Sequence, residues 1–204
     1  KSVATLVALL HMDGADGSSV FTDETGKTWT VTGNARIRTA QAKFGQSVGF
    51  DGSASWLAAP SGPEFNFGTG DFTWECFAYW TGSGNCALLS IDSNWTLYRA
   101  TDNNLWVYNG TTAHILGGGF QALNVWDHIA LTRAGGTLRL FRNGVLLSSA
   151  SYPNNLPSNN FVIGASANGA YTYMKGYIDE VRIHRGVALY MANFTPPSTP
   201  FTYP

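Results

Sequence analysis

The central part of the chain alternates apolar and polar residues in short segments that tight-turn sequences separate. Three of these segments are joined by two-residue Gly-Gly and Asn-Gly turns: residues 128–133, 137–142 and 145–149. Turns of this type match the twist of paired strands and are strong local signals of β-hairpins. In the second segment Leu138 and Leu140 share one side, while Arg139 and Phe141 share the other. The pattern predicts an antiparallel meander of three strands with one apolar face.

Other short apolar segments extend this pattern over most of the chain. Turns rich in Asn, Asp and Gly separate four segments that predict a second meander: residues 87–91, 95–100, 105–109 and 111–116. Further strands are expected over four more segments: residues 5–10, 72–80, 161–164 and 176–184. Residues 187–192 are expected to form one helical turn. About a dozen strands at this spacing predict an all-β sandwich of two antiparallel sheets.

The segment 72–80 carries large side chains on both of its faces. Trp74 and Cys76 alternate with Phe77 and Tyr79. A strand of this composition is covered on both sides, or it presents one side to a ligand.

The two cysteines are predicted to remain free thiols. We expect residues 72–80 to pair with residues 87–92 across the turn at residues 81–85. Reflection about this turn places Cys76 and Cys86 out of register, farther apart than the roughly 7 Å between Cα atoms that a disulfide allows. The cysteines therefore indicate no particular redox compartment.

Length and charge limit the classes of protein to consider. The chain has 204 residues, and a sandwich of this size routinely forms one domain. We expect a single domain over residues 1–204 with an extended Pro-rich tail at residues 195–204. The net charge of −1 and the absence of a Lys/Arg run argue against a nucleic-acid partner. No apolar run approaches the roughly 20 residues that span a bilayer, which argues against membrane insertion. Because the chain starts at Lys1, we expect a processed product or a piece of a longer polypeptide.

Seven motifs, taken in order and spacing, carry a resemblance to a known family. They are residues 9–14 (LLHMDG), 50–53 (FDGS), 67–73 (FGTGDFT), 126–133 (WDHIALTR), 141–144 (FRNG), 176–183 (GYIDEVRI) and 193–197 (NFTPP). Together they resemble the concanavalin A-like lectin/glucanase superfamily, in the laminin-G-like, pentraxin-type form found in bacteriophage tail and capsid-decoration proteins. The resemblance covers nearly the whole chain and implies a jelly-roll sandwich. It says less about function, because members bind sugars, bind proteins, hydrolyse glycans or build particles.

The distribution of carboxylates argues against glycoside hydrolysis. That reaction usually needs two carboxyl groups roughly 5–10 Å apart on one face. Glu75 is the natural candidate, but its same-face neighbours include Thr73 and Phe77 and no acidic residue. Asp179 and Glu180 are adjacent, so a regular strand would point them to opposite faces. We therefore expect a non-catalytic protein and keep a glycoside hydrolase as the weaker alternative.

A structural calcium ion is the one cofactor that the resemblance implies. Related jelly rolls commonly hold calcium between an early segment and an aspartate of the last long strand. By that resemblance the ligands would be Asp179 and Asp13, with backbone oxygens of residues 45–47, because calcium takes six to eight oxygen ligands. The alternative is that Asp179 caps a turn or pairs with Arg182, and that Asp13 only ends a strand.

Aromatic residues are the candidates for ligand binding, because their flat apolar faces and polar edges suit sugar rings. Tyr171 and Tyr173 lie in a Gly- and Asn-rich loop, and Trp95 and Trp106 lie in the second meander. The alternative for each of them is packing in the core or at its rim.

The functional expectation combines these observations. The resemblance favours a non-catalytic module on a virion surface, in a phage tail fibre or as capsid decoration. Its partners would be other virion proteins or host surface glycans, and it would be a homo-oligomer in the particle. The alternative is a secreted or cell-surface domain that binds carbohydrate or protein.

Overall fold

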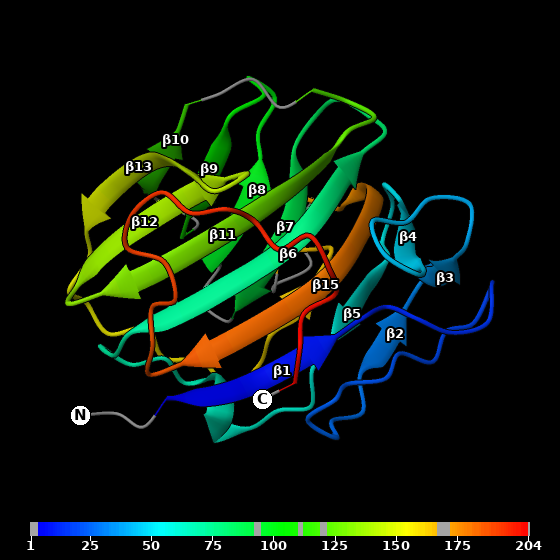
Figure 1. Cartoon of the computed structure of the whole chain (residues 1–204), viewed down its shortest axis with the longest axis horizontal. Coiled ribbons are helices and arrows are strands. Elements are labelled where there is room, and N and C mark those ends of the chain that lie inside the picture. The colour runs from blue at the N-terminus through cyan, green and yellow to red at the C-terminus, as the bar shows by residue number, and fades with distance from the viewer. Residues whose placement is uncertain (1–3, 92–94, 110–111, 119–121, 167–171, 204) are drawn as a thin grey trace.

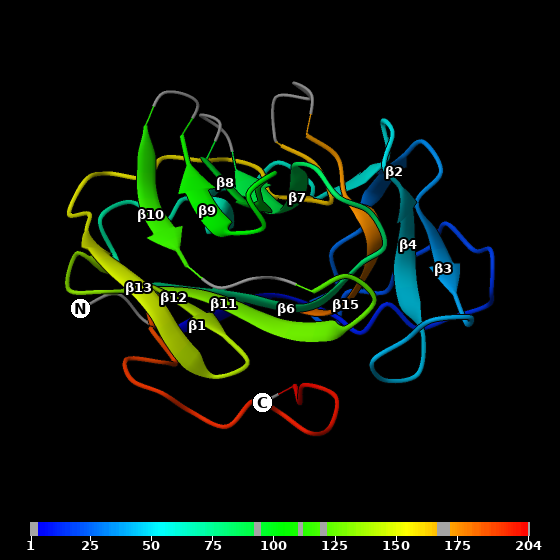
Figure 2. The same ribbon diagram turned by 90° about the horizontal axis from the view of Figure 1, so that it is seen from above.

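Two antiparallel sheets stack face to face in the computed structural model, which describes residues 4–91, 95–109, 112–118, 122–166 and 172–203 (Figures 1 and 2). Neighbours in the eight-stranded sheet are β13 (Val145–Ser151), β12 (Thr137–Arg142), β11 (Trp126–Ala134), β6 (Phe72–Trp80), β15 (Lys175–Arg185), β4 (Ser47–Asp51) and β3 (Arg36–Arg38), and β1 (Thr5–Leu10) also pairs with β15. Neighbours in the seven-stranded sheet are β10 (Ala113–Gly117), β9 (Leu105–Tyr108), β8 (Trp95–Arg99), β7 (Cys86–Ile91), β14 (Val162–Ile163), β5 (Trp56–Ala58) and β2 (Thr30–Thr32). A short 3₁₀ helix, η1 (Pro63–Phe65), precedes β6. The predicted all-β, two-sheet architecture is confirmed.

The core lies between the two sheets and collects one side of each strand. Leu138 and Leu140 of β12 are fully buried there, as their alternation predicted. The indole of Trp74 on β6 is also fully buried, and its ring centre lies 5.0 Å from that of Phe161 in an edge-to-face contact. Removing an aromatic side chain at such a position costs about 3–5 kcal/mol.

Both predicted meanders are present. β11, β12 and β13 are consecutive neighbours, as are β7, β8, β9 and β10. At the turn between β12 and β13 both residues have positive φ, 48° for Asn143 and 78° for Gly144, which the Asn-Gly sequence accommodates. Gly144 has a second reason to lack a side chain, because a Cβ there would lie 1.8 Å from the carbonyl oxygen of Phe194.

The predicted pairing of residues 72–80 with residues 87–92 is wrong. β6 pairs with β11 and β15 in the eight-stranded sheet, whereas β7 pairs with β8 and β14 in the seven-stranded sheet. Residues 81–85 therefore cross from one sheet to the other. Cys76 and Cys86 are free and buried, so the prediction of two free thiols is confirmed.

Residues 187–203, which we call the C-terminal segment, run across the outer face of the eight-stranded sheet (red in Figures 1 and 2). The helical turn predicted at residues 187–192 is absent from this described part of the chain, where the backbone bends instead. A threonine of the sheet forms hydrogen bonds with backbone C=O and N–H groups that would otherwise bond within such a helical turn. The Thr73 hydroxyl donates to the Val187 carbonyl at 3.1 Å and accepts from the Leu189 N–H at 2.9 Å.

The C-terminal segment covers the second face of β6. Both faces of this strand are therefore buried, which explains its large side chains on both sides. Within the described residues, no helix has the length and apolar character to cross a membrane.

Candidate functional site

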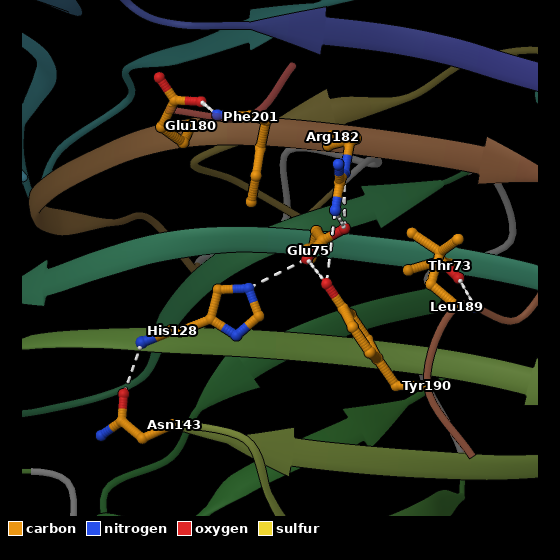
Figure 3. Close-up of polar contacts among 9 residues, drawn as sticks. All are labelled: Thr73, Glu75, His128, Asn143, Glu180, Arg182, Leu189, Tyr190 and Phe201. Carbon is orange, nitrogen blue, oxygen red and sulfur yellow. Dashed lines mark hydrogen bonds and ion pairs between the residues drawn. The ribbon is translucent and has the colours of Figure 1, made fainter. Parts of the chain in front are cut away.

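Glu75, the residue that the sequence offered as a catalytic candidate, is fully buried on the outer face of β6. One carboxylate oxygen accepts the Nε–H of Arg182 at 2.7 Å. The other lies 3.0 Å from Nε2 of His128 and accepts the Tyr190 hydroxyl at 2.9 Å. Figure 3 shows the three partners pointing at the carboxylate from β15, β11 and the C-terminal segment. We call these four residues the Glu75 cluster.

The charge state of Glu75 follows from these partners. Burial opposes ionisation, but the hydrogen bond with His128 and the charge of Arg182 together hold the pKa of Glu75 below its usual value. The carboxylate is therefore ionised at neutral pH with its hydrogen-bonding capacity largely used.

The C-terminal segment seals the Glu75 cluster from solvent. The ring of Tyr190 stacks on Phe194 with centroids 3.6 Å apart, and the Arg182 guanidinium lies 4.2 Å from the ring centre of Phe201. A general acid must reach its substrate, and glycoside hydrolysis usually needs a second carboxyl nearby. The Glu75 cluster is thus suited to anchoring the C-terminal segment and not to acid–base catalysis.

Asp13 and Asp179, the predicted calcium ligands, both contact the turn before β4. One Asp179 oxygen accepts the N–H groups of Lys43 and Phe44, each at 2.8 Å, and Asp13 accepts the N–H of Gln46 at 2.8 Å. The segments that the resemblance named therefore lie next to each other. The turn presents N–H groups to these carboxylates, however, whereas a calcium shell needs oxygens. Among the described residues, no three His, Cys, Asp or Glu side chains gather to hold a metal ion. This geometry fits an anchored turn better than a calcium shell, and calcium stays a prediction.

A β-bulge changes the orientation of the acidic pair in β15. The register with β6 shifts between Asp179 and Arg182, and Glu180 has a φ of 51°. Regular alternation therefore fails, and the expectation that the two side chains point to opposite faces is wrong. Glu180 lies 2.8 Å from Nδ1 of His11 and accepts the N–H of Phe201 at 2.7 Å. Burial raises the pKa of Asp179 to about 8.

The three predicted ligand-binding aromatics that the structure describes do not converge on one site. Trp95 is 3% exposed and packs on Tyr152 with centroids 4.7 Å apart, where both rings line a pocket of about 200 Å³, so its role in ligand binding stays a prediction. Tyr173 is half-buried and stacks on Trp56 at 6.2 Å. Tyr171 lies outside the described residues. Trp106 is half-buried and points away from the core, where it contacts other aromatic rings of the seven-stranded sheet.

An open pocket that sequence reasoning missed lies on the outer face of the eight-stranded sheet, at its β3–β4 end. Its volume is about 440 Å³. Seven polar or aromatic residues line it: Asn34, Arg36, Arg38, Phe50, Asp51, Thr81 and Tyr177. Strand pairing brings them together, because Arg36 and Tyr177 both pair with Gly49, from opposite sides. We call this the Arg38 pocket. The local signal was the Arg-Ile-Arg alternation at residues 36–38, but the sequence does not show that Tyr177 joins it.

Asp51 is fixed at one side of the Arg38 pocket. One of its oxygens accepts the N–H of Ser53 at 3.0 Å and the Ser53 hydroxyl at 2.7 Å, and the Ser55 hydroxyl also donates to it at 3.1 Å. The other oxygen accepts the side-chain amide of Asn34 at 3.0 Å. The hydrogen bonds from Ser53 and Asn34 hold the pKa of Asp51 well below its usual value, so the carboxylate is ionised.

The two arginines of the Arg38 pocket are not neutralised by ion pairs. No carboxylate of the described residues lies within 4.0 Å of the guanidinium nitrogens of Arg36 or Arg38. Arg36 is held by its Nη1, which donates to the carbonyls of Gly33 at 3.1 Å and Ala35 at 2.7 Å. The Arg38 stem crosses Gly49, where a Cβ would lie 2.8 Å from Arg38 Cγ.

A row of half-buried aromatic rings continues from the Arg38 pocket over the same outer face. The ring centres of Tyr177 and Tyr79 are 5.9 Å apart, and those of Tyr79 and Trp126 are 5.4 Å apart. The Trp126 indole N–H donates to the Gln41 side chain at 3.2 Å. The pocket thus combines hydrogen-bonding groups with an adjoining aromatic surface, which is the combination that ligand sites use.

Two antiparallel sheets packed face to face define the class of protein as a β-sandwich. The laminin G model of the concanavalin A-like lectin/glucanases superfamily matches residues 51–189. The chain belongs to this superfamily, which confirms the resemblance of its motifs at the level of the superfamily.

Solved structures with the same fold include domains of glycoside hydrolases. Domain 4 of AbnA, a GH43 extracellular arabinanase from Geobacillus stearothermophilus solved in complex with arabinotriose, is 22% identical, with a TM-score of 0.68 over 90% of this chain and 93% of that one. A mutant of Trypanosoma rangeli sialidase with trans-sialidase activity is 15% identical, with a TM-score of 0.64 over 90% of this chain and 31% of that one. The chain thus spans about a third of the sialidase. No curated protein sequence matches the chain. At these identities the likeness shows the fold alone.

Proposed function

We propose that this protein is a non-catalytic carbohydrate-binding module that holds a glycan in the Arg38 pocket. The observation that carries the proposal is the pocket itself, in which charged and amide groups converge beside the aromatic ring of Tyr177. Its volume of about 440 Å³ is that of a small-ligand site. Domain 4 of AbnA, which shares the fold, was solved with arabinotriose and supports a glycan as the ligand.

The proposal of a non-catalytic role rests on the carboxylates. Among the described residues that line the Arg38 pocket Asp51 is the one carboxylate, and glycoside hydrolysis usually needs two. Glu75 is sealed beneath the C-terminal segment. We therefore expect the purified protein to bind glycans without cleaving them, which an assay for released reducing sugar checks.

The test of glycan binding is a glycan array followed by calorimetry with each sugar that binds. Tyr177→Ala removes the aromatic contact of the pocket and should weaken binding about 10-fold or more. Tyr203→Ala is the matched control, because Tyr203 is 58% exposed and outside the pocket. Equal affinities of the two variants would contradict the assignment of the pocket.

A second surface is favoured by one specific observation, the aromatic side chains on the outer face of the seven-stranded sheet. The ring centre of Tyr98 lies 6.3 Å from that of Trp106 and 6.5 Å from that of Tyr108. Sugar binding at this surface would be lost in Trp106→Ala and retained in Tyr177→Ala. The same calorimetric series therefore distinguishes the two surfaces.

We further propose that the module serves on a virion surface, where it would contact host glycans or neighbouring virion proteins as part of a homo-oligomer. The support is the closing motif at residues 193–197, which resembles phage virion domains. A secreted or cell-surface module is the alternative setting. Quantitative mass spectrometry of purified particles checks the proposal, which requires a fixed copy number of the chain per particle.

A further inference from the structure

We infer that the Arg38 pocket selects glycans that carry a carboxylated sugar, of the uronic acid or sialic acid class. Arg36 and Arg38 would bind the sugar carboxylate, and Asp51 with Asn34 would bind its hydroxyls. The inference rests on the proposed function, because it names the class of sugar for the same pocket.

The first argument is the charge of the pocket. Arg36 and Arg38 bring two positive charges and Asp51 brings one negative charge, so the lining is positive although the chain has a net charge of −1. On the same outer face, Arg182 is neutralised by Glu75 at 2.7 Å. The pocket arginines have no such partner among the described side chains, so a ligand anion can supply it.

The second argument is the geometry of the donors. Nη1 of Arg36 is occupied by the carbonyls of Gly33 and Ala35, which fixes the guanidinium and leaves its Nη2 donors for a ligand. Arg38 is held by packing, because its stem crosses Gly49 beside the ring of Tyr177. A guanidinium fork binds a carboxylate through two parallel hydrogen bonds, and one in a fixed position loses little entropy on binding.

The third argument explains why the ligand would be an acidic sugar and not a simple anion. Within the described part of the chain, the Asp51 oxygen that accepts from Asn34 receives that one hydrogen bond, and a carboxylate oxygen can accept a second. An ionised carboxylate repels an anion but accepts hydrogen bonds from hydroxyl groups. A ligand that fits both ends of the pocket therefore carries a carboxylate and neighbouring hydroxyls, with an apolar ring face for Tyr177.

The test compares pairs of sugars that differ in the carboxylate alone. Calorimetry with the full chain would use galacturonic acid, glucuronic acid and N-acetylneuraminic acid, each against its methyl ester. We expect each acid that binds to do so about 10- to 100-fold more tightly than its ester. Raising the salt concentration should reduce the difference, because screening weakens the attraction between exposed charges.

Variants assign the preference to the two arginines. Arg36→Met combined with Arg38→Met should abolish the preference for the acid over the ester, and Arg38→Lys should retain part of it because the charge remains. Arg139→Met is the matched control, since Arg139 lies on the same outer face in β12 outside the pocket. Its binding should equal that of the unchanged protein.

The outcomes separate this inference from the proposed function. Equal binding of acids and esters, with loss of both in Tyr177→Ala, would overturn the acidic class and leave a glycan-binding pocket. Binding of no sugar in the array or the calorimeter would overturn both. Binding of polyglutamate as tight as that of the acidic sugars would also overturn the inference, because it would show a general anion site.

Discussion

The outer face of the eight-stranded sheet places arginines in two different environments, one covered and one open. At the covered end Arg182 meets a carboxylate that also bonds with His128 and Tyr190, and the C-terminal segment closes over the group. At the open end Arg36 and Arg38 line the Arg38 pocket and form no ion pair with a carboxylate of the described residues. One sheet surface thus holds a cluster whose arginine is paired with a carboxylate, and a pocket whose arginines have no ion-pair partner among the described residues.

The difference teaches how to distinguish a structural charge from a functional one. A buried carboxylate without partners would be costly, and the Glu75 cluster removes that cost by supplying donors from three elements. An arginine at an open surface bears no comparable desolvation cost, so folding does not require an ion-pair partner for it. Stability should therefore depend on the covered end and binding on the open end.

The largest expected effect follows from removing the central carboxylate of the covered end. Glu75→Gln deprives Arg182 of its counter-charge, and breaking a buried ion pair from one side costs about 3–5 kcal/mol. Urea unfolding measures the change in the free energy of unfolding. The cost should shrink as pH falls below 4.5, because a carboxylate whose pKa is lowered in the folded state stabilises the fold only while it is ionised.

Glu24→Gln is the control for that comparison. Glu24 is exposed, and substitutions at such sites usually change stability by less than about 0.5 kcal/mol. If Glu75→Gln were no more destabilising than Glu24→Gln, the Glu75 cluster would not anchor the C-terminal segment.

The second expected effect concerns Asp179, whose pKa is raised to about 8 by burial. Between the ordinary value of 3.8 and about 8 the folded state retains a proton that the unfolded state loses, so stability falls by up to about 1.4 kcal/mol per pH unit. Asp179→Asn removes this penalty. The variant should therefore gain stability relative to the unchanged protein as pH rises from 4 to 8.

Thermal unfolding across that pH range measures the difference, and Glu75→Gln serves as the internal comparison. For Glu75 the slope lies below 4.5, so in a series extended below pH 4 its variant should lose relative stability as pH rises toward 4.5 and stay level above it. Two variants with opposite pH trends are expected. A flat difference for Asp179→Asn would show that the buried carboxylate is already ionised at low pH.

Much of the strand pattern could be predicted because it is encoded locally. The Asn143-Gly144 turn fixes the hairpin of β12 and β13 through two residues with positive φ. The crossing of residues 81–85 between the sheets was missed, because a short turn between two apolar strands looks the same whether the strands pair or separate. The bend at Val187 was also missed, since it depends on Thr73, which lies 114 positions away.

The candidate site was harder to predict for the same reason. The resemblance named Asp13 and Asp179, which both lie at the turn before β4, but it could not show that backbone N–H groups face them. The Arg38 pocket combines Arg36 and Arg38 of β3 with Tyr177 of β15, which strand pairing through Gly49 brings together. The residue types of the site can be recognised in the sequence, but which of them lie side by side depends on the order of the strands in the sheet.

The smallest expected effect is on stability at the open end. Arg38→Met removes a charge that has no ion partner among the described residues, so the free energy of unfolding should change by less than about 0.5 kcal/mol while glycan affinity falls. Arg142→Met is the matched comparison, because Arg142 lies 3.0 Å from the fully buried carboxylate of Asp127 and its loss should cost about 3 kcal/mol. Chemical denaturation of both variants in parallel gives the two values. A loss of stability in Arg38→Met as large as that in Arg142→Met would place Arg38 among the structural arginines, and the contrast between the two ends of the sheet would no longer hold.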